Sequence, residues 1–210
     1  MDAEQTDWAN PFGMDADCRH CPALCETRER VVHGYGDVGA DFLFVAEAPD
    51  AAAEANGVPL TGGDRGEHFQ DLLGHLGLSN SLPDAEWPEL ENAYVTCLTR
   101  CRHPERPPTD DEVGNCEPFL NAEVRSINPE ILIAVGERPF RELLADYTTD
   151  DPAAYDLAES HATTVRGRGF ELVPMVDPAA QSEADAEAFL KHFAALMARD
   201  YRQTKGRRSR

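Results

Sequence analysis

The chain has 210 residues, of which 41% are hydrophobic, and its formal net charge at pH 7 is -20. This length is enough for one domain with a sizeable core. No apolar run is long enough to span a bilayer, and no basic-then-apolar leader opens the chain. We therefore expect a soluble, cytoplasmic, monomeric protein that does not associate with membranes.

The acidity allows two interpretations. Asp and Glu number 39 against 19 Lys and Arg, and the acids are interspersed through otherwise globular segments. In an ordinary cell such a charge argues against nucleic-acid binding, because phosphates repel it. In a cytoplasm at high salt, charges are screened within about 3 Å at 1 M. The composition resembles that of halophilic proteins, and under that interpretation the net charge says little against DNA binding.

The first half of the chain begins with a cysteine-rich segment at 18–35, which we expect to form a metal-binding knuckle with a short helix at 26–32. A glycine-punctuated loop then leads into the apolar run FLFVA at 42–46, which is predicted to be a buried strand. A loop rich in small residues follows. Apolar residues at helical spacing predict a helix at 66–76.

A second strand is predicted at 92–99, and a long helix at 109–127. Thr109 and Glu112 form a capping-box pattern at the start of that helix. Its predicted buried face consists of Val113, Cys116, Leu120 and Val124.

The unbroken apolar run at 131–135 predicts a central strand that is buried on both faces. A short helix at 138–146 and a loop without clear pattern at 147–162 come next. The last strand is predicted at 171–176 and a long helix at 182–201, with Phe189, Phe193, Leu196 and Met197 directed inward.

Strands and helices alternate along the whole chain, which predicts an α/β fold. We expect a three-layer α/β/α arrangement with a short, mostly parallel central sheet and an N-terminal cysteine knuckle. One domain spans residues 1–210, and residues 202–210 form a basic tail that we expect to be flexible.

Glu47 comes directly after the first predicted strand, in the sequence AEAPD. In open α/β sheets the carboxyl ends of the strands face the ligand crevice. A carboxylate at that position either caps the next turn or takes part in chemistry.

Six cysteines are present, with a CxxC pair near the N-terminus and two more that fourteen residues separate. The chain is too large to need disulfides, so metal or cluster ligation is the better interpretation. Four thiolates suit either a [4Fe–4S] cluster or a tetrahedral zinc ion, and the sequence alone does not separate the two. The cysteines are Cys18, Cys21, Cys25, Cys97, Cys101 and Cys116.

Five segments together resemble the iron–sulfur uracil-DNA glycosylases known as family 4. They are CRHCPALCETRERVVHGYGDVGADFLFVAEAP, GVPLTG, the YVTCLTRCRHP…C segment, NPEILIAVG and VPMVDPA, and they cover about residues 18–180. The resemblance implies a base-excision-repair enzyme that cleaves the N-glycosidic bond of uracil in DNA. It also implies a [4Fe–4S] cluster on Cys18, Cys21, Cys101 and Cys116, with zinc as the alternative. Cys25 either replaces Cys21 as a ligand or packs against the knuckle.

The resemblance assigns the catalytic carboxylate to Glu47, with Ala48 and Pro49 shaping the turn beside the base. Glycosylases read a flipped base in a pocket, and a carboxylate near the sugar stabilises the positive charge that develops there.

Four positions depart from the family pattern. The glycine that follows the proline is Asp50, and the base-stacking aromatic falls on Leu60, which has no π-face. The base-reading asparagine falls on Cys97, a weak hydrogen-bond donor. The histidine expected to donate to the base oxygen falls on Asp177. An ionised aspartate would repel the developing anion, so Asp177 helps only if it is protonated, with burial near Glu47 and Asp50 favouring a shared proton, or if the substrate offers an N–H donor. Alternatively, Asp177 caps the turn before the last helix.

Basic residues are expected to contact DNA phosphates, or alternatively to pair with the abundant carboxylates. The candidate contacts are Arg102, Arg106, Arg166 and Arg168, with Arg100, His103 and the basic tail as further members.

Three functions remain open at this point. The first is a glycosylase with an altered base pocket, acting on uracil or on another deaminated base. The second is a non-catalytic iron–sulfur protein that binds nucleic acid and keeps the fold. The third is an electron-transfer or zinc protein.

Overall fold

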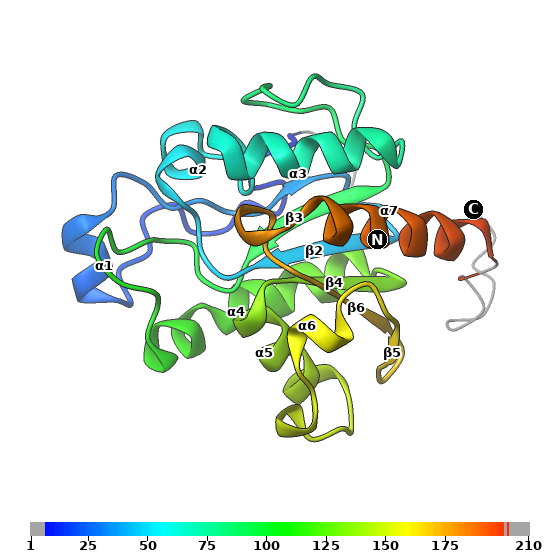
Figure 1. The fold of residues 1–210 in the computed structure, drawn as a ribbon. Coiled ribbons are helices and arrows are strands. Elements are labelled where there is room, and N and C mark those ends of the chain that lie inside the picture. Colours follow the sequence, from blue (N-terminus) through cyan, green and yellow to red (C-terminus); the bar gives the residue numbers. More distant parts are fainter. Residues whose placement is uncertain (1–6, 200, 202–210) are drawn as a thin grey trace.

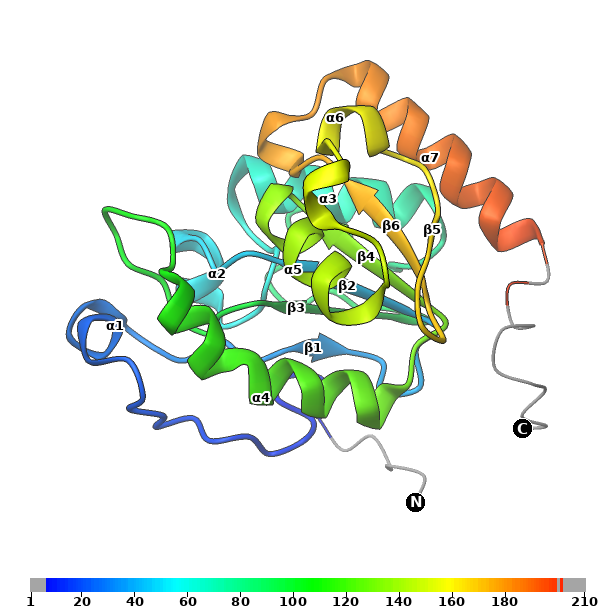
Figure 2. The same ribbon diagram turned by 90° about the horizontal axis from the view of Figure 1, so that it is seen from below.

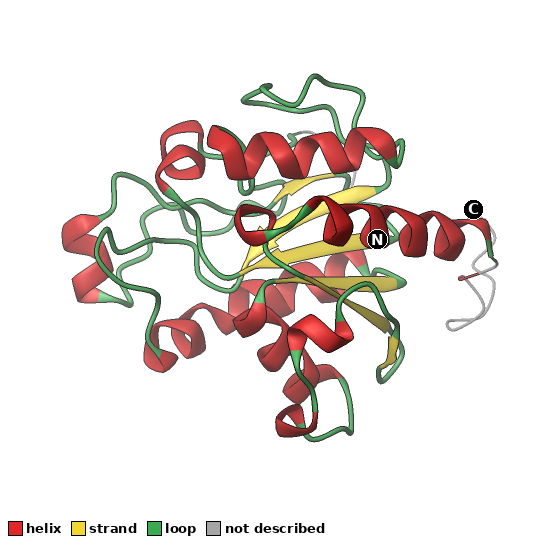
Figure 3. Cartoon of the chain, viewed as in Figure 1, coloured by secondary structure: helices red, strands yellow, loops and turns green. Residues whose placement is uncertain are grey.

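The computed structural model describes residues 7–199 and Tyr201, and it confirms the α/β/α fold. A six-stranded sheet lies between two layers of helices (Figures 1 and 3). Its strand order is β1-β3-β2-β4-β6-β5, and the four central strands are parallel. The elements in chain order are α1 (Pro22–Thr27), β1 (Tyr35–Gly36), β2 (Phe42–Ala46), α2 (Ala51–Asn56), α3 (Gly63–His75), β3 (Ala93–Cys97), α4 (Asp110–Ile127), β4 (Ile131–Val135), α5 (Glu137–Tyr147), η1 (Pro152–Ala154), α6 (Leu157–Ser160), β5 (Val165–Arg166), β6 (Glu171–Met175), η2 (Pro178–Ala180) and α7 (Glu183–Ala198).

The central strands are apolar on both sides because helices cover both faces of the sheet. Phe42 and Phe44 of β2 belong to the core cluster that includes Phe69 of α3 and Phe193 of α7. The alternate residues of β2 belong to the cluster under α4 and α5 on the other face. Figure 2 shows α4 on the side of the sheet away from α3 and α7. Because successive side chains of a strand point to opposite faces of the sheet, each central strand contributes to two core clusters, one on each face.

Several predicted boundaries shift in the structure. The short helix expected at 26–32 lies earlier, at Pro22–Thr27, with the proline in its first turn. The loop expected after β2 contains α2, which Asp50 caps by accepting a hydrogen bond from the Ala53 amide at 2.9 Å. The segment 147–162 contains η1 and α6. In the part of the chain that is described, no helix combines the length and apolarity needed to cross a membrane.

The strand order reverses at β2, because the next strand in the chain, β3, lies on one side of β2 and the following one, β4, lies on the other. In open α/β sheets, ligands bind outside the carboxyl ends of the strands at such a reversal. The residues that follow β2, β4 and β6 are Glu47, Gly136 and Val176–Asp177. Topology therefore places the predicted catalytic residues at one edge of the sheet.

Candidate functional site

Glu47 lies at the carboxyl end of β2 with 35% of its side chain exposed. Its carbonyl oxygen accepts a hydrogen bond from the Thr99 amide at 3.1 Å, which joins the loops that follow β2 and β3. Burial raises the pKa of the Glu47 carboxyl above its ordinary value, and Asp177 raises it further, while Arg138 and Arg65 oppose the shift. Glu47 is therefore a half-buried carboxylate in the electrostatic field of three other charged residues.

Arg138, in the first turn of α5, is a site residue that the sequence did not indicate. Its Nη1 lies 3.9 Å from Oε1 of Glu47. The same guanidinium binds Asp110 at 2.6 Å and Glu142 at 3.5 Å. The side chain is thus held by α4 and α5 beside the predicted catalytic carboxylate.

Asp50 and Asp177 both face the same arginine, Arg65 of α3. Nε of Arg65 donates to Oδ1 of Asp177 at 2.9 Å, and Nη2 donates to Oδ2 at 2.8 Å. Nη1 of Arg65 donates to Oδ2 of Asp50 at 3.2 Å. The two carboxylates therefore flank one guanidinium group. Asp177 also accepts the Ala179 amide at 3.0 Å, so the expected capping role is present as well.

Leu60 and Cys97, the predicted base-binding positions, are both 1% exposed and belong to the core cluster under α3 and α7. Burial raises the pKa of the Cys97 thiol to about 12. Leu60 has a φ of 55°, in the left-handed region that leucine rarely adopts. Ala48 and Asp50 are half-buried and Pro49 is buried, so they form the turn between Glu47 and α2.

The predicted ligands Cys18, Cys21, Cys101 and Cys116 are all buried, and Cys21 and Cys101 share a small core cluster with Leu24. Their proximity is visible in the pKa of Cys116, which burial raises and which the thiolates of Cys21 and Cys18 would raise further. Arg28 donates to the Cys101 sulfur at 3.2 Å.

Asn115 donates to the sulfur of Cys21 at 3.5 Å, while the Cys25 thiol donates to the carbonyl of Cys18 at 3.7 Å. The sulfurs of two predicted ligands, Cys101 and Cys21, thus accept N–H donors, and hydrogen bonds of this kind tune iron–sulfur clusters. Within the described residues, no three His, Cys, Asp or Glu side chains are arranged to hold a single metal ion.

The candidate DNA contacts divide into three groups. Arg100 is 1% exposed and binds the buried Glu123 at 2.7 Å, so the expectation that Arg100 contacts phosphate is wrong. Arg102 pairs with Glu54 at 2.9 Å and Arg106 with Glu112 at 2.8 Å, which is the carboxylate pairing that the sequence left open. Both keep part of their side chains exposed and lie on the loop that follows β3.

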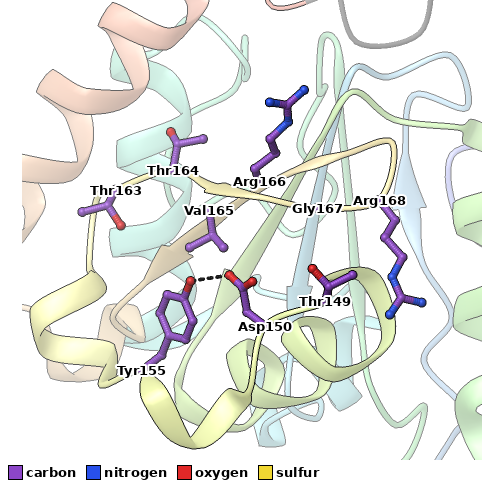
Figure 4. Close-up of a pocket in the computed structure, with 9 residues that line it drawn as sticks. All are labelled: Thr149, Asp150, Tyr155, Thr163, Thr164, Val165, Arg166, Gly167 and Arg168. Atoms are coloured by element: carbon purple, nitrogen blue, oxygen red, sulfur yellow. Dashed lines mark hydrogen bonds between the residues drawn. The ribbon is translucent and has the colours of Figure 1, made fainter.

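Arg166 and Arg168 lie elsewhere. Arg166 pairs in register with Glu171 at the amino end of β6, whereas Asp177 follows the carboxyl end of that strand. They line a hollow of about 560 Å³, in which the Asp150 and Tyr155 side chains face each other and the Arg166 side chain points away (Figure 4). Arg166 thus lies at the opposite end of β6 from Asp177, and its predicted contact with DNA stays a prediction, as does that of Arg168. The basic tail at 202–210 lies outside the described residues.

Residues 33–199 match the family model of the uracil DNA glycosylase superfamily. The chain is 33% identical over 121 residues to a type-4 uracil-DNA glycosylase of Saccharolobus solfataricus, a match that covers 57% of this chain and 50% of the relative. It is 31% identical over 120 residues to the type-4 enzyme of Archaeoglobus fulgidus, covering 57% and 54%. A type-5 uracil-DNA glycosylase of Thermus thermophilus is 32% identical over 152 residues, covering 62% and 68%.

The matched segment spans 50% to 54% of the type-4 relatives named above. The match to the family model nevertheless covers the sheet, the crevice residues and most of the flanking helices. This chain therefore belongs to the uracil DNA glycosylase superfamily.

Proposed function

We propose that this protein is a DNA glycosylase of base-excision repair that releases uracil or another deaminated base. The observation that carries the proposal is the placement of Glu47, in a superfamily member, at the carboxyl end of β2 beside the strand-order reversal. The family membership supports the reaction class, and the site supports a carboxylate that acts next to the sugar.

In the proposed reaction the bond between C1′ of the sugar and the base nitrogen breaks, and its electron pair leaves with the base. The Glu47 carboxylate stabilises the positive charge on the sugar and accepts a proton from the water that bonds to C1′. The departing base takes up a proton at its nitrogen. Ala48, Pro49, Asp50, Leu60, Cys97 and Asp177 surround the flipped base in this proposal.

The base pocket is proposed to differ from that of a typical family member. Leu60 supplies no aromatic face and Cys97 no amide, and both are buried in the present conformation. Since a glycosylase reads the flipped base by stacking and hydrogen bonds, we expect weak uracil release or preference for another deaminated base. Arg102 and Arg106 are the proposed phosphate contacts, because they lie on the loop after β3 and remain partly exposed.

The test is single-turnover cleavage, at high salt, of oligonucleotides that contain uracil, hypoxanthine or xanthine. We expect Glu47→Gln to slow release of the preferred base by about 10²-fold or more, the scale of a lost acid–base group. Glu187→Gln, which changes an exposed carboxylate on α7, is the matched control and should leave the rate unchanged. Uracil release as fast as that of a typical family member would contradict the altered pocket.

The second candidate is a non-catalytic DNA-binding protein of the same superfamily. It is favoured by the burial of Leu60 and Cys97 and by the absence of the family's histidine at Asp177. DNA binding without release of any base, unaffected by Glu47→Gln, would establish it. A gain of uracil release in Asp177→His would show instead that the pocket diverged at that position.

We further propose that Cys18, Cys21, Cys101 and Cys116 hold a [4Fe–4S] cluster, which fits four buried thiols with N–H donors on two of their sulfurs. Its role would be structural, tying the N-terminal knuckle to the loop after β3. Iron and zinc analysis of anaerobically purified Cys116→Ser and Cys25→Ser proteins tests this assignment. Iron should be lost from the first and retained in the second, whereas zinc retained in stoichiometric amount would contradict the cluster.

A further inference from the structure

Arg65 binds two carboxylates, Asp50 and Asp177, and no step of the proposed reaction uses it. It lies in the first turn of α3, and its side chain is 16% exposed. It joins α3 to the turns that follow β2 and β6, through Asp50 and Asp177. A guanidinium is therefore fixed between two of the positions at which this chain departs from the family pattern.

Both carboxylates are themselves anchored by the backbone. Asp50 accepts the Ala53 amide at 2.9 Å while its other oxygen binds Arg65. Asp177 accepts the Ala179 amide at 3.0 Å and binds Arg65 through both oxygens. Because each partner is held in place, the guanidinium is oriented before any ligand arrives.

The first turn of α3 is rigid for a second reason. A Cβ added to Gly66 would lie 2.4 Å from the backbone carbon of Thr61, so only glycine permits this close approach of helix and loop. The neighbouring Arg65 is thereby fixed at its backbone as well as at its side-chain end.

The guanidinium retains donors for a ligand. Arginine has five N–H groups, and the three nitrogens of Arg65 each direct one toward Asp50 or Asp177. Two N–H groups remain. Arg65 and Asp177 also act on the pKa of Glu47, which places the guanidinium within electrostatic reach of the catalytic carboxylate.

We infer that Arg65 stabilises the departing base by donating hydrogen bonds to its carbonyl oxygen, with Asp50 and Asp177 as positioning residues. The inference rests on the proposed glycosylase function and deepens it. When the glycosidic bond breaks, the electron pair is shared between the base nitrogen and the adjacent carbonyl oxygen. Arg65 stabilises this anion as a cation and keeps its own protons, because a guanidinium is not deprotonated in proteins.

The inference also defines the substrate class. The base must carry a carbonyl oxygen next to the glycosidic nitrogen, as uracil and other 2-oxopyrimidines do. Hypoxanthine has no carbonyl at that place, so it should gain nothing from Arg65. Asp177 is then the residue that holds the donor, rather than the donor itself.

The experiment compares single-turnover release of uracil and of 5-fluorouracil. Fluorine stabilises the departing anion, so 5-fluorouracil needs less help from the protein. Arg65→Ala should slow uracil release by about 10²- to 10³-fold, the usual cost of one donor to a developing anion. It should slow 5-fluorouracil release less, so the rate of 5-fluorouracil release divided by the rate of uracil release should be higher in Arg65→Ala than in the wild type. Arg65→Lys keeps the positive charge but loses the planar set of N–H donors, so its uracil release rate should lie between those of Arg65→Ala and the wild type.

Controls separate this role from a structural one. Arg141→Ala removes an exposed arginine of α5 that pairs with Glu137, and both rates should stay unchanged. If Arg65→Ala does not fold, Arg65→Lys and Arg65→Gln provide the same ratio. Equal losses on both substrates, or no loss, would overturn the inference and leave the proposed function intact. Failure of the wild-type protein to release any base would overturn both.

Discussion

Two arginine–carboxylate pairs in this molecule have similar distances and different surroundings. Arg100 and Glu123 are each 1% exposed and lie 2.7 Å apart. Arg65 and Asp177 lie 2.8 Å apart, with side chains that are 16% and 29% exposed. The first pair is enclosed by the core, and the second is partly exposed and lies within electrostatic reach of Glu47.

The partners of the two carboxylates explain the difference. Tyr94, Thr96 and the Gly34 amide all donate to Glu123, in addition to Arg100. Every oxygen of that carboxylate is thus occupied by protein, and the pair joins α4 to β3 and to the loop that carries Cys101. Arg65 and its two carboxylates join α3 to the turns after β2 and β6, and the guanidinium retains donors for a ligand. Burial and the donors left over, rather than the ion-pair distance, distinguish a structural pair from a functional one.

The largest expected effect breaks the buried pair. Arg100→Met leaves an uncompensated charge on Glu123 and should lower the free energy of unfolding by about 3–5 kcal/mol. Arg65→Met is the matched variant, because it makes the same change at a pair that keeps solvent contact. It should lower the free energy of unfolding by about 1 kcal/mol or less. Chemical denaturation of both variants measures the contrast, and equal losses would contradict it.

A rescue experiment sharpens the same point. If the loss in Arg100→Met comes from the stranded carboxylate, then adding Glu123→Gln should recover part of the lost stability. The corresponding second change at the crevice, Asp177→Asn in Arg65→Met, should recover little because that carboxylate can bind water. Additive losses in the first double variant would assign the effect to packing instead of charge.

Much of the fold was readable because its signals are local. The run at 42–46 and the run at 131–135 are strands with the predicted bounds, since buried parallel strands are continuously apolar. The Thr109 and Glu112 capping box is present at the start of α4. The two-residue strands β1 and β5 gave no such signal, because their pairing depends on neighbouring strands and not on their own residues.

The site was readable only in part. Glu47 was indicated by its position after a strand, which topology then places at the crevice. Arg65 was missed because its main partner, Asp177, is 112 residues away. Arg100 was misjudged because an arginine beside a cysteine motif looks the same in sequence whether it faces solvent or a buried Glu123. The position of Arg166 at the opposite end of β6 from Asp177 was not readable from the sequence, because it depends on the antiparallel pairing of β5 with β6.

The smallest expected effect concerns a third pair, Arg138 and Glu47, whose atoms lie 3.9 Å apart with side chains 21% and 35% exposed. Burial raises the pKa of Glu47, and Arg138 partly opposes that shift. A carboxyl whose pKa is raised on folding stabilises the protein while protonated, and this contribution is lost as pH rises from the ordinary value through the raised one. The free energy of unfolding of the wild type should therefore fall slightly as pH rises through this range. In Glu47→Gln this fall should be absent.

The same pKa sets the acid limb of catalysis, because only ionised Glu47 stabilises the sugar cation. Activity should fall as pH drops through the raised pKa of Glu47. Arg138→Ala removes the opposing cation, so the limb should move to higher pH, and the change should be small because the pair is long and partly solvated. Arg138→Lys keeps the charge and should leave the limb in place. Single-turnover rates against pH measure the shift; a limb that moves to lower pH in Arg138→Ala would show that Arg138 does not act on Glu47 through its charge.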